Sequence, residues 1–318
     1  MTEPSLRLRT AAVLPVRGHA RLLDGCLAAL REQDVPLDEI VVVDDSGTDD
    51  DPLAPADLPG VTVVRSYGRG PYAARNVGWR ATHADVVLFL DARSRPRPEW
   101  SRALLTPFAD HDVALVGSEV EVSNGAALGA RASHAQQFYR LRNYLARPFF
   151  MPYLPTCNLA VRRRDLAVVQ GFGEVRSGGD ADFCWRVLSQ PGRRLEAVDE
   201  VLMDWIPRDR ARDYLEQNYR YGGSNHQLRS EWSDRGAAPA TPVGHLRLAK
   251  RLASVSLRLA AARARHDDEG SITYLTHAAG LCFDVGYRIA TDRSRLADLR
   301  GRGMRQEGPA HRGQVSHP

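Results

Sequence analysis

The sequence has few cysteines: four in 318 residues, and no pair lies at the close spacing typical of zinc or redox sites. Each of the four, Cys26, Cys157, Cys184 and Cys282, falls in a segment with an apolar or helical pattern. Scattered cysteines in such segments behave as small apolar side chains. We therefore expect four reduced thiols in the core.

Long apolar runs are also missing, because no stretch approaches the roughly 18 apolar residues that indicate a membrane span. The chain does not open with the charged and then apolar pattern of a signal peptide. Hydrophobic residues make up 43% and charged residues 26%, as in ordinary globular proteins. We expect a cytoplasmic protein, and leave open peripheral attachment at the inner face of the membrane.

Neither sign of charge dominates the chain, and the net charge is only +4. A dedicated nucleic-acid binder would carry a dense basic stripe, so we expect no nucleic-acid partner. A mild basic excess is compatible with an anionic substrate or an anionic membrane surface. No internal repeat is present.

Four apolar segments in the first part of the chain predict buried strands, at 10–16, 39–43, 61–64 and 86–90. Helical patterns or loops separate them, which is typical of a parallel sheet built from right-handed crossovers. The predicted fold class is α/β, an open, Rossmann-like and mostly parallel sheet flanked by helices. The chain could form one large domain or one domain with an appendage.

The later segments depart from simple alternation of strands and helices. We predict an exposed edge strand at 113–122 and a Tyr- and Arg-rich helix at 131–145. Two further strands are expected at 156–161 and 195–203, and two further helices at 182–188 and 209–228. The predicted domain limits are a catalytic α/β domain at 1–229, a linker at 230–243, a helical C-terminal extension at 244–297 and a disordered tail at 298–318.

Two amphipathic helices are expected in the extension, at 246–265 and 272–289, and the first is basic. Such helices pack on their own domain, dimerise with a second subunit or lie on an anionic membrane surface. All three remain open.

Carboxylates stand at the ends of the predicted strands and in a glycine-rich loop. They are Asp44 with Asp45, Asp91, and Asp180 with Asp182. Open α/β sheets bind ligands beyond the carboxyl ends of their strands, so these groups should share a cleft. Guanidinium groups suited to phosphate lie near them in sequence, at Arg69, Arg75, Arg93, Arg95 and Arg220. Together they favour a phosphorylated substrate with hydroxyl groups, although an Asp at a loop start also caps the backbone.

A dinucleotide site is the competing interpretation. Gly68, Gly70 and Ala73 form a GxGxxA pattern between a strand and a helix, and Asp91 ends the next strand, as in an NAD(P)-dependent Rossmann enzyme. However, Pro71 removes a backbone donor from the helix start, and the pattern follows the third strand instead of the first. A non-catalytic module that binds carbohydrate or a membrane surface is a third alternative.

Six short segments, in order, resemble the successive motifs of the family 2 glycosyltransferases, inverting enzymes with the GT-A fold. They are Val13-Leu14-Pro15-Val16-Arg17, Ile40-Val41-Val42-Val43-Asp44-Asp45-Ser46, Ala74-Arg75-Asn76-Val77-Gly78, Leu88-Phe89-Leu90-Asp91-Ala92, Asn158-Leu159-Ala160-Val161-Arg162 and Gly178-Gly179-Asp180-Ala181-Asp182-Phe183-Cys184-Trp185-Arg186. Each is weak alone, but six at the family's spacing form a specific signal.

The resemblance implies a nucleotide diphosphosugar donor, with a UDP-sugar as the first candidate. It implies a donor site formed by Pro15, Val16, Arg17, Asp44, Asp45, Arg75, Asn76, Asp91, Ala92 and Arg93. It also implies that Asp180 is the general base that takes the proton of the acceptor hydroxyl, with Asp182 as a second catalytic candidate. Arg220 and Tyr221 lie in a segment that resembles the family's QxxRW motif, which implies contact with the acceptor or the diphosphate.

The family's DxD motif reads Asp91-Ala92-Arg93 here. Similar proteins hold Mn²⁺ or Mg²⁺ with this motif, but Arg93 replaces the second aspartate and leaves Asp91 as the one motif ligand. We hypothesise that Arg93, with Arg95 or Arg220, neutralises the diphosphate; the alternative is a metal held by Asp91 and the diphosphate. The acceptor is left open between a lipid-linked molecule, an envelope glycan and a natural product.

Overall fold

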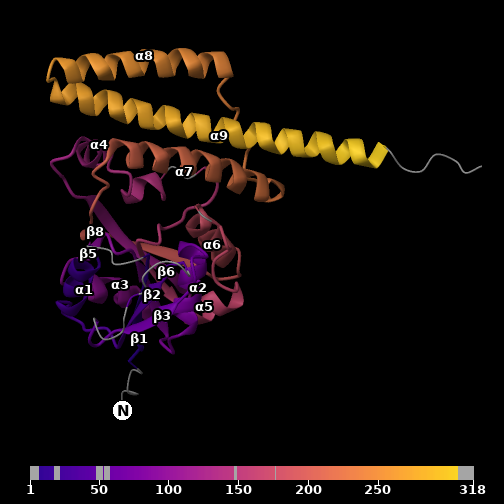
Figure 1. The fold of residues 1–318 in the computed structure, drawn as a ribbon. Helices are drawn as coiled ribbons and strands as arrows, with labels where there is room; N and C mark the ends of the chain where they lie inside the picture. The colour runs from indigo at the N-terminus through magenta and orange to yellow at the C-terminus, as the bar shows by residue number, and fades with distance from the viewer. Residues whose placement is uncertain are drawn as a thin grey trace, which may run out of the picture.

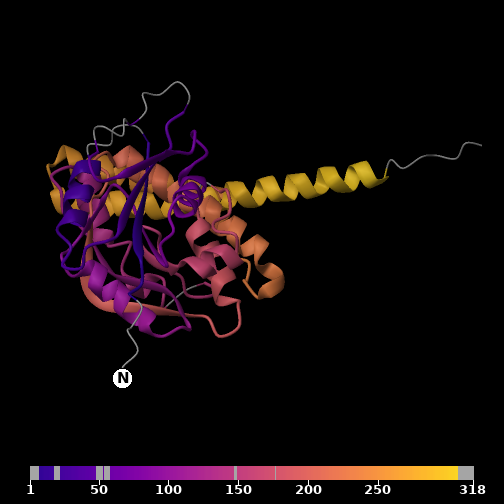
Figure 2. The ribbon, with the colours of Figure 1, turned by 90° about the horizontal axis from the view of Figure 1, so that it is seen from below.

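The computed structural model describes residues 7–17, 22–47, 53, 58–146, 149–175 and 177–306. One sheet with helices on both sides forms the body of the molecule, and three long helices stack on one end of it (Figure 1). The last of these helices projects well past the body, as the view from below also shows (Figure 2).

The first half of the sheet is parallel, as predicted. Its strands lie in the order β3-β2-β1-β4, with bounds Thr62–Arg65, Glu39–Asp44, Thr10–Val16 and Val86–Leu90. Each strand of the inner pair, β1 and β4, is almost wholly buried, because helices cover both faces. The helices between these strands are α1 (Leu23–Arg31) and α2 (Pro71–Arg80). The parallel strands all end at one edge, and that edge carries Asp91 directly after β4.

The second half of the sheet is mixed. The order continues β4-β7-β6-β8-β5, with bounds Asn158–Arg162, Val113–Val122, Arg194–Trp205 and Ser94–Pro96 for the four added strands. β7 is antiparallel to β4 and to β6, whereas β6 and β8 are parallel. The prediction that 113–122 forms an edge strand is wrong, because β6 lies between β7 and β8. The polar side chain of Glu119, which suggested an edge strand, instead accepts hydrogen bonds from Arg140 and from the backbone N–H of Leu141.

Two apolar layers form the core, one on each face of the sheet. Trp100 and Phe108 are fully buried on one face, and Phe89 and Phe183 on the other. The remaining helices of the body are α3, α5 and α6, at Trp100–Leu105, Arg163–Val168 and Gly179–Leu188. Cys26, Cys157 and Cys184 are buried and free, as expected, whereas the free Cys282 is half-buried.

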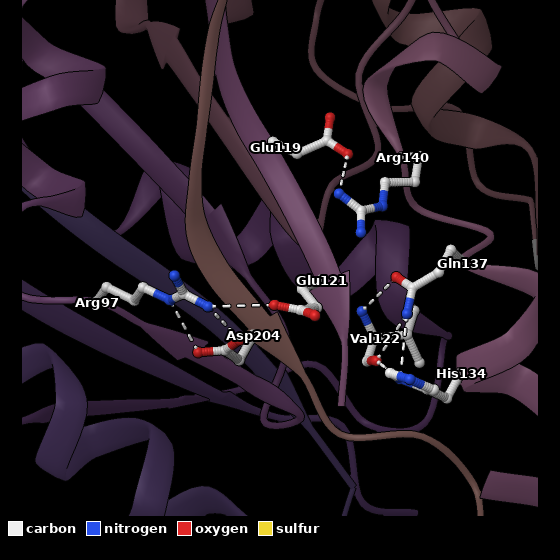
Figure 3. Close-up of polar contacts among 8 residues, drawn as sticks. All are labelled: Arg97, Glu119, Glu121, Val122, His134, Gln137, Arg140 and Asp204. Atoms are coloured by element: carbon white, nitrogen blue, oxygen red, sulfur yellow. Dashed lines mark hydrogen bonds and ion pairs between the residues drawn. The ribbon is translucent and has the colours of Figure 1, made fainter. Parts of the chain in front are cut away.

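The helix predicted at 131–145 ends early. α4 spans Leu128–Gln136, and the next residue, Gln137, has a left-handed φ of 46°. The side chain of Gln137 bonds both backbone polar groups of Val122, and Nδ1 of His134 contacts the same carbonyl at 2.7 Å (Figure 3). These bonds to β6 replace the helical ones and turn the chain, so that Phe138 and Tyr139 face the end of the sheet where the long helices lie.

Side chains on β5, β6 and β8 tie this end of the sheet together. Arg97, just after β5, donates to Asp204 of β8 at 2.9 Å and to Glu121 of β6 at 3.4 Å (Figure 3). Arg140 donates to Glu119 at 3.2 Å in the same view. The segment after α4 is therefore anchored to the sheet.

Three long helices follow the body: α7 (Ala211–Glu231), α8 (His245–Ala264) and α9 (Asp268–Gln306). α9 lies against α7 through two glycines, since a Cβ at Gly222 would stand 1.9 Å from the carbonyl oxygen of Phe283 and one at Gly286 would stand 2.0 Å from that of Tyr219. The backbones of α7 and α9 are therefore in direct contact, and α9 packs closely along α7.

Two of these helices extend past the predicted domain limits. α7 extends to Glu231, two residues into the predicted linker, and a short helical turn occupies Ser233–Arg235. α9 continues to Gln306, beyond the expected end of the extension at 297. The remainder of the predicted tail, 307–318, lies outside the described residues.

α8 contacts the rest of the protein chiefly through α9 and leaves Leu246 and Leu257 exposed. Within the described part of the chain, no helix has the length and apolar character needed to cross a membrane.

Candidate active site

A cavity of about 850 Å³ opens at the carboxyl ends of β1 and β4, between the sheet, α6, α7 and α9. It brings together most of the site residues predicted from the sequence. Those that line it are Pro15, Val16, Arg17, Arg75, Asp91, Ala92, Arg93, Asp180, Arg220 and Tyr221. The position agrees with the general rule for open α/β sheets.

The floor of the cavity holds an ion pair. Nη2 of Arg75, a buried residue of α2, donates to Oδ1 of Asp91 at 2.6 Å. Nη1 of Arg75 donates to the carbonyl of Pro71 at 3.3 Å, whereas its buried Nε has no partner. The Asp91 backbone N–H donates to the hydroxyl of Ser94 at 3.2 Å, which fixes the turn after β4. Asp91 is therefore already neutralised by a protein cation.

Arg93 lies between that ion pair and the end of β8. Its Nη1 donates to the carbonyls of Ile206 and Pro207 at 3.1 and 2.9 Å, and its Cζ lies 5.8 Å from the ring centroid of Trp205. Burial lowers the pKa of Arg93 below its ordinary value, and the nearby charge of Arg208 lowers it further. Arg93 is thus partly buried and not a free surface cation.

Asp180 occupies the first turn of α6, after Gly178 in a left-handed conformation (φ 82°). Its Oδ1 accepts hydrogen bonds from the hydroxyl of Tyr72 at 3.2 Å and from the backbone N–H of Ala181 at 3.1 Å. Burial raises the pKa of Asp180, and these two bonds and the charge of Arg75 oppose the increase. A carboxylate with a raised pKa that faces a cavity can accept a proton from a bound hydroxyl group.

Aromatic side chains form the wall near Asp180. Phe138 stacks on Tyr221, with ring centroids 5.2 Å apart, and the hydroxyls of Tyr139 and Tyr221 lie 3.4 Å apart. Tyr144 and Tyr153 complete this wall and lie close enough for Asp180 to contribute to their raised pKa values, which arise mainly from burial. Sequence reasoning missed all but Tyr221, although the Tyr-rich pattern of 131–145 was a signal.

Four residues of the predicted donor and catalytic set do not line the cavity, and neither do Arg69 and Arg95, two of the predicted phosphate-binding arginines. Asp44 is fully buried and accepts hydrogen bonds from the backbone N–H groups of Ser46 and Leu53 at 2.9 and 3.0 Å. Asp45 accepts bonds from the Ser66 hydroxyl at 2.6 Å and the Gly70 N–H at 3.0 Å. Both aspartates organise the loops beside the cavity.

The other two residues of the donor and catalytic set that do not line the cavity are Asn76 and Asp182. Asn76 bonds both backbone polar groups of Phe172, donating at 2.7 Å and accepting at 2.9 Å. Asp182 pairs with Arg186 at 2.8 Å and accepts from Nε1 of Trp232 at 3.1 Å. In both cases the side chain joins segments distant in the sequence and is turned away from the cavity.

The dinucleotide interpretation finds little support in the same loops. The N–H of Gly70, which would face a pyrophosphate, donates to Asp45. Asp91, which would bind a ribose, is paired with Arg75. The groups that such a cofactor requires are therefore already bonded to other protein groups.

Comparison with known proteins resolves the alternatives, since residues 11–169 match the family model described as "Glycosyl transferase family 2". The chain belongs to this family of glycosyltransferases. It is 32% identical over 234 residues to the pre-mycofactocin glycosyltransferase of Mycobacterium tuberculosis, covering 71% of this chain and 48% of that protein. This family 2 glycosyltransferase therefore spans about half the length of that relative.

A second relative is the glycosyltransferase AglE of Haloferax volcanii, which is 25% identical over 228 residues, or 69% of this chain and 73% of that protein. Among solved structures, the mannosyltransferase PcManGT from Pyrobaculum calidifontis, in complex with GDP-Man and Mn²⁺, has a TM-score of 0.58 at 20% identity, with 90% of this chain and 87% of that chain covered. Glucosyl-3-phosphoglycerate synthase from Mycobacterium tuberculosis, with Mn²⁺, UDP and phosphoglyceric acid, has a TM-score of 0.51 at 21% identity, with coverage of 74% and 81%. These likenesses confirm the predicted GT-A fold.

The side chains of this family 2 glycosyltransferase do not fit a divalent metal well. Among the described residues, no group of three His, Cys, Asp or Glu side chains is placed to hold a metal ion. Asp91 is paired with Arg75, and the third position of the DxD motif carries a guanidinium instead of an oxygen ligand. Mg²⁺ and Mn²⁺ require several oxygen ligands, which this combination does not supply.

Proposed function

We propose that this glycosyltransferase transfers a sugar with inversion from a nucleotide diphosphosugar, with UDP-sugars as the first donor class, to a hydroxyl group of an acceptor. The observation that carries the proposal is the position of Asp180. It is a carboxylate with a raised pKa, in the same cavity as Arg75, Asp91 and Arg93 at the strand ends. The proposed base and the proposed phosphate-binding groups therefore line the same cavity.

The reaction requires one displacement. The acceptor oxygen forms a bond to the anomeric carbon while the bond from that carbon to the diphosphate oxygen breaks. The acceptor proton passes to Asp180, and the nucleoside diphosphate leaves with its bonding electron pair. Placing both substrates in one cavity supplies much of the rate increase, because the encounter becomes effectively intramolecular.

The donor lies, in this proposal, along the strand ends. Pro15, Val16, Arg17 and Ala92 contact the nucleotide, and they line the cavity on the side of β1 and β4. Asp44, Asp45 and Asn76 act on the donor indirectly, because they hold the loops that border it. Asp182 likewise positions α6, the helix that carries Asp180.

The acceptor approaches Asp180 from the side of α7 and α9. Phe138, Tyr144, Tyr153 and Tyr221 line this side, so we propose an acceptor whose hydroxyl group is attached to an aromatic or apolar body. A matched pair of acceptors tests this, namely an aryl glycoside and the methyl glycoside of the same sugar. The aryl compound should have a KM lower by about tenfold, as expected for burial of one ring, and equal KM values would contradict the proposal.

A donor screen tests the function itself. Purified protein is incubated with UDP- and GDP-sugars and an acceptor, and products are detected by mass spectrometry, with the anomeric configuration assigned by NMR. Inversion of the anomeric centre is expected. A retained configuration would refute the proposed mechanism, and thermal stabilisation by NAD(P) but not by UDP or GDP would refute the proposed substrate class.

A further inference from the structure

Two arginines from neighbouring segments, Arg93 and Arg208, line the same cavity. Arg93 follows β4 and Arg208 follows β8. They are 115 positions apart in the sequence. The antiparallel pairing of β5 with β8 brings these segments together, because Ser94 is opposite Trp205. The positive charge of Arg208 acts on Arg93 strongly enough to contribute to its lowered pKa, after burial. Two neighbouring cations of this kind repel each other until an anion binds between them.

Three arginines that line the cavity each have a donor without a partner. The buried Nε atoms of Arg75, Arg208 and Arg220 have no hydrogen-bond partner. Buried donors without partners are unusual in folded proteins and need an explanation, such as a bound ion. Among the described residues, six arginines and three aspartates line the cavity: Arg17, Arg75, Arg93, Arg208, Arg220 and Arg229, with Asp91, Asp180 and Asp284. The cavity therefore has an excess of positive charge in the absence of ligand.

Guanidinium groups are suited to a diphosphate because each presents a planar fork of N–H donors to two oxygens. Arg93 is ordered for this role, since the carbonyls of Ile206 and Pro207 hold it in place. It also stands where the DxD motif would otherwise supply a metal ligand. The cations thus occupy the region in which the leaving group of the proposed reaction develops charge.

We propose that Arg93 and Arg208 bind the diphosphate of the donor in place of a divalent metal, with Arg220 as an additional donor. The inference rests on the proposed function and assigns the group that neutralises its leaving nucleotide. Arg208 was not among the residues identified from the sequence. Binding of UDP should consequently be independent of divalent cations.

Titration calorimetry with UDP tests the proposal in a form that does not depend on turnover. The wild-type protein should bind UDP with the same Kd, within about twofold, in EDTA and in Mn²⁺. Arg208→Gln should weaken binding by about tenfold to a hundredfold in EDTA, as expected for one lost charge-assisted hydrogen bond. Arg212→Gln is the control, because Arg212 is an exposed arginine at the start of α7 and does not line the cavity; its Kd should be unchanged.

Arg93→Asp provides the complementary test, because it restores an Asp-x-Asp sequence. UDP binding by this variant should be weak in EDTA and should recover when Mn²⁺ is added, which the wild-type protein should not show. Melting temperatures of all variants are measured first, since Arg93 also bonds two backbone carbonyls. If Arg93→Asp does not fold, the Arg208→Gln result decides by itself.

Two results would overturn the proposal in distinguishable ways. If wild-type UDP binding required Mn²⁺ and Arg208→Gln bound UDP normally, the arginine inference would be wrong while the proposed transferase function stood. If neither UDP nor GDP bound in EDTA or in Mn²⁺, the proposed function and the inference would both fall.

Discussion

The hydroxyl group of Tyr72 donates a hydrogen bond to Oδ1 of Asp180 at 3.2 Å, although the two residues belong to different helices. Gly179 permits this contact, since a Cβ there would stand 2.9 Å from the Tyr72 ring. Tyr72 lies three residues before Arg75, which pairs with Asp91. One helix, α2, thus connects the proposed base to the ion pair at the strand ends.

Replacement of the proposed base should abolish transfer without unfolding the protein. We expect Asp180→Asn to lower kcat by about a hundredfold to ten-thousandfold, the contribution typical of a positioned acid–base group. UDP affinity should be unchanged. Because burial raises the pKa of Asp180, the charged form is unfavourable in the folded state, and the melting temperature at pH 7 should not fall. Near-normal turnover would exclude Asp180 as the base.

The rate should depend on pH through the same carboxyl group. Asp180 must be unprotonated to accept a proton, so kcat/KM should decrease as the pH falls through its raised pKa. The decrease should therefore begin at a higher pH than an ordinary carboxyl group, with a pKa of 3.8, would give. The opposite sign holds for stability, because the native state retains a proton that the unfolded chain has lost, so the contribution of Asp180 to stability declines as pH rises through that interval.

Tyr72→Phe should shift this pH profile further. The Tyr72 hydrogen bond favours the charged carboxylate, so its removal should raise the pKa of Asp180 and move the acidic decrease in kcat/KM to higher pH. The variant keeps the ring that packs on Gly179. An unchanged acidic limb would show that Tyr72 does not tune the base.

Asp182 should respond differently from Asp180. It pairs with Arg186 within α6, its bond with Trp232 connects α6 to the end of α7, and it does not line the cavity. Asp182→Asn should therefore lower the free energy of unfolding by about 1 kcal/mol, as expected for one partly exposed ion pair and hydrogen bond. Denaturant unfolding measures this loss. A kcat that fell as far as that of Asp180→Asn would instead place Asp182 in the chemistry.

The contact between α7 and α9 can be tested with two glycines. In Gly222→Ala the new methyl group would meet the Phe283 carbonyl, which belongs to the backbone, so α9 must move. We expect a loss of about 1–3 kcal/mol in stability, typical of overpacking, and a higher acceptor KM, because Phe283 and Tyr287 line the cavity.

Gly280→Ala, in the partner helix α9, is the control, since nothing lies within 4 Å of the Cβ it would add. It should leave KM unchanged and stabilise α9 by up to about 1 kcal/mol, the difference in helix propensity between the two residues. Equal effects of the two substitutions would mean that the α7–α9 contact does not shape the acceptor site.

The apolar pattern of the chain was enough to predict the parallel half of the sheet and the carboxylate at its edge. Strands β1 and β4 are largely apolar and almost wholly buried, as expected where both faces of a sheet are covered. Asp91, Arg75 and Asp180 could be identified because they lie in short motifs at fixed distances from these strands. The order of the motifs was also sufficient to identify the glycosyltransferase family.

Which distant side chains come together depends on long-range strand pairing and could not be predicted from local patterns. The local pattern of β6 suggested an edge, but the pairing of β7 and β8 on its two sides is a long-range outcome that no local alternation encodes. The turn at Gln137 depends on bonds to Val122. Arg208 reaches Arg93 because β8 pairs with β5, and neither residue carries a local signal of that contact. The backbone and apolar periodicity fix the scaffold, whereas the charge and shape of the cavity arise where separate segments converge.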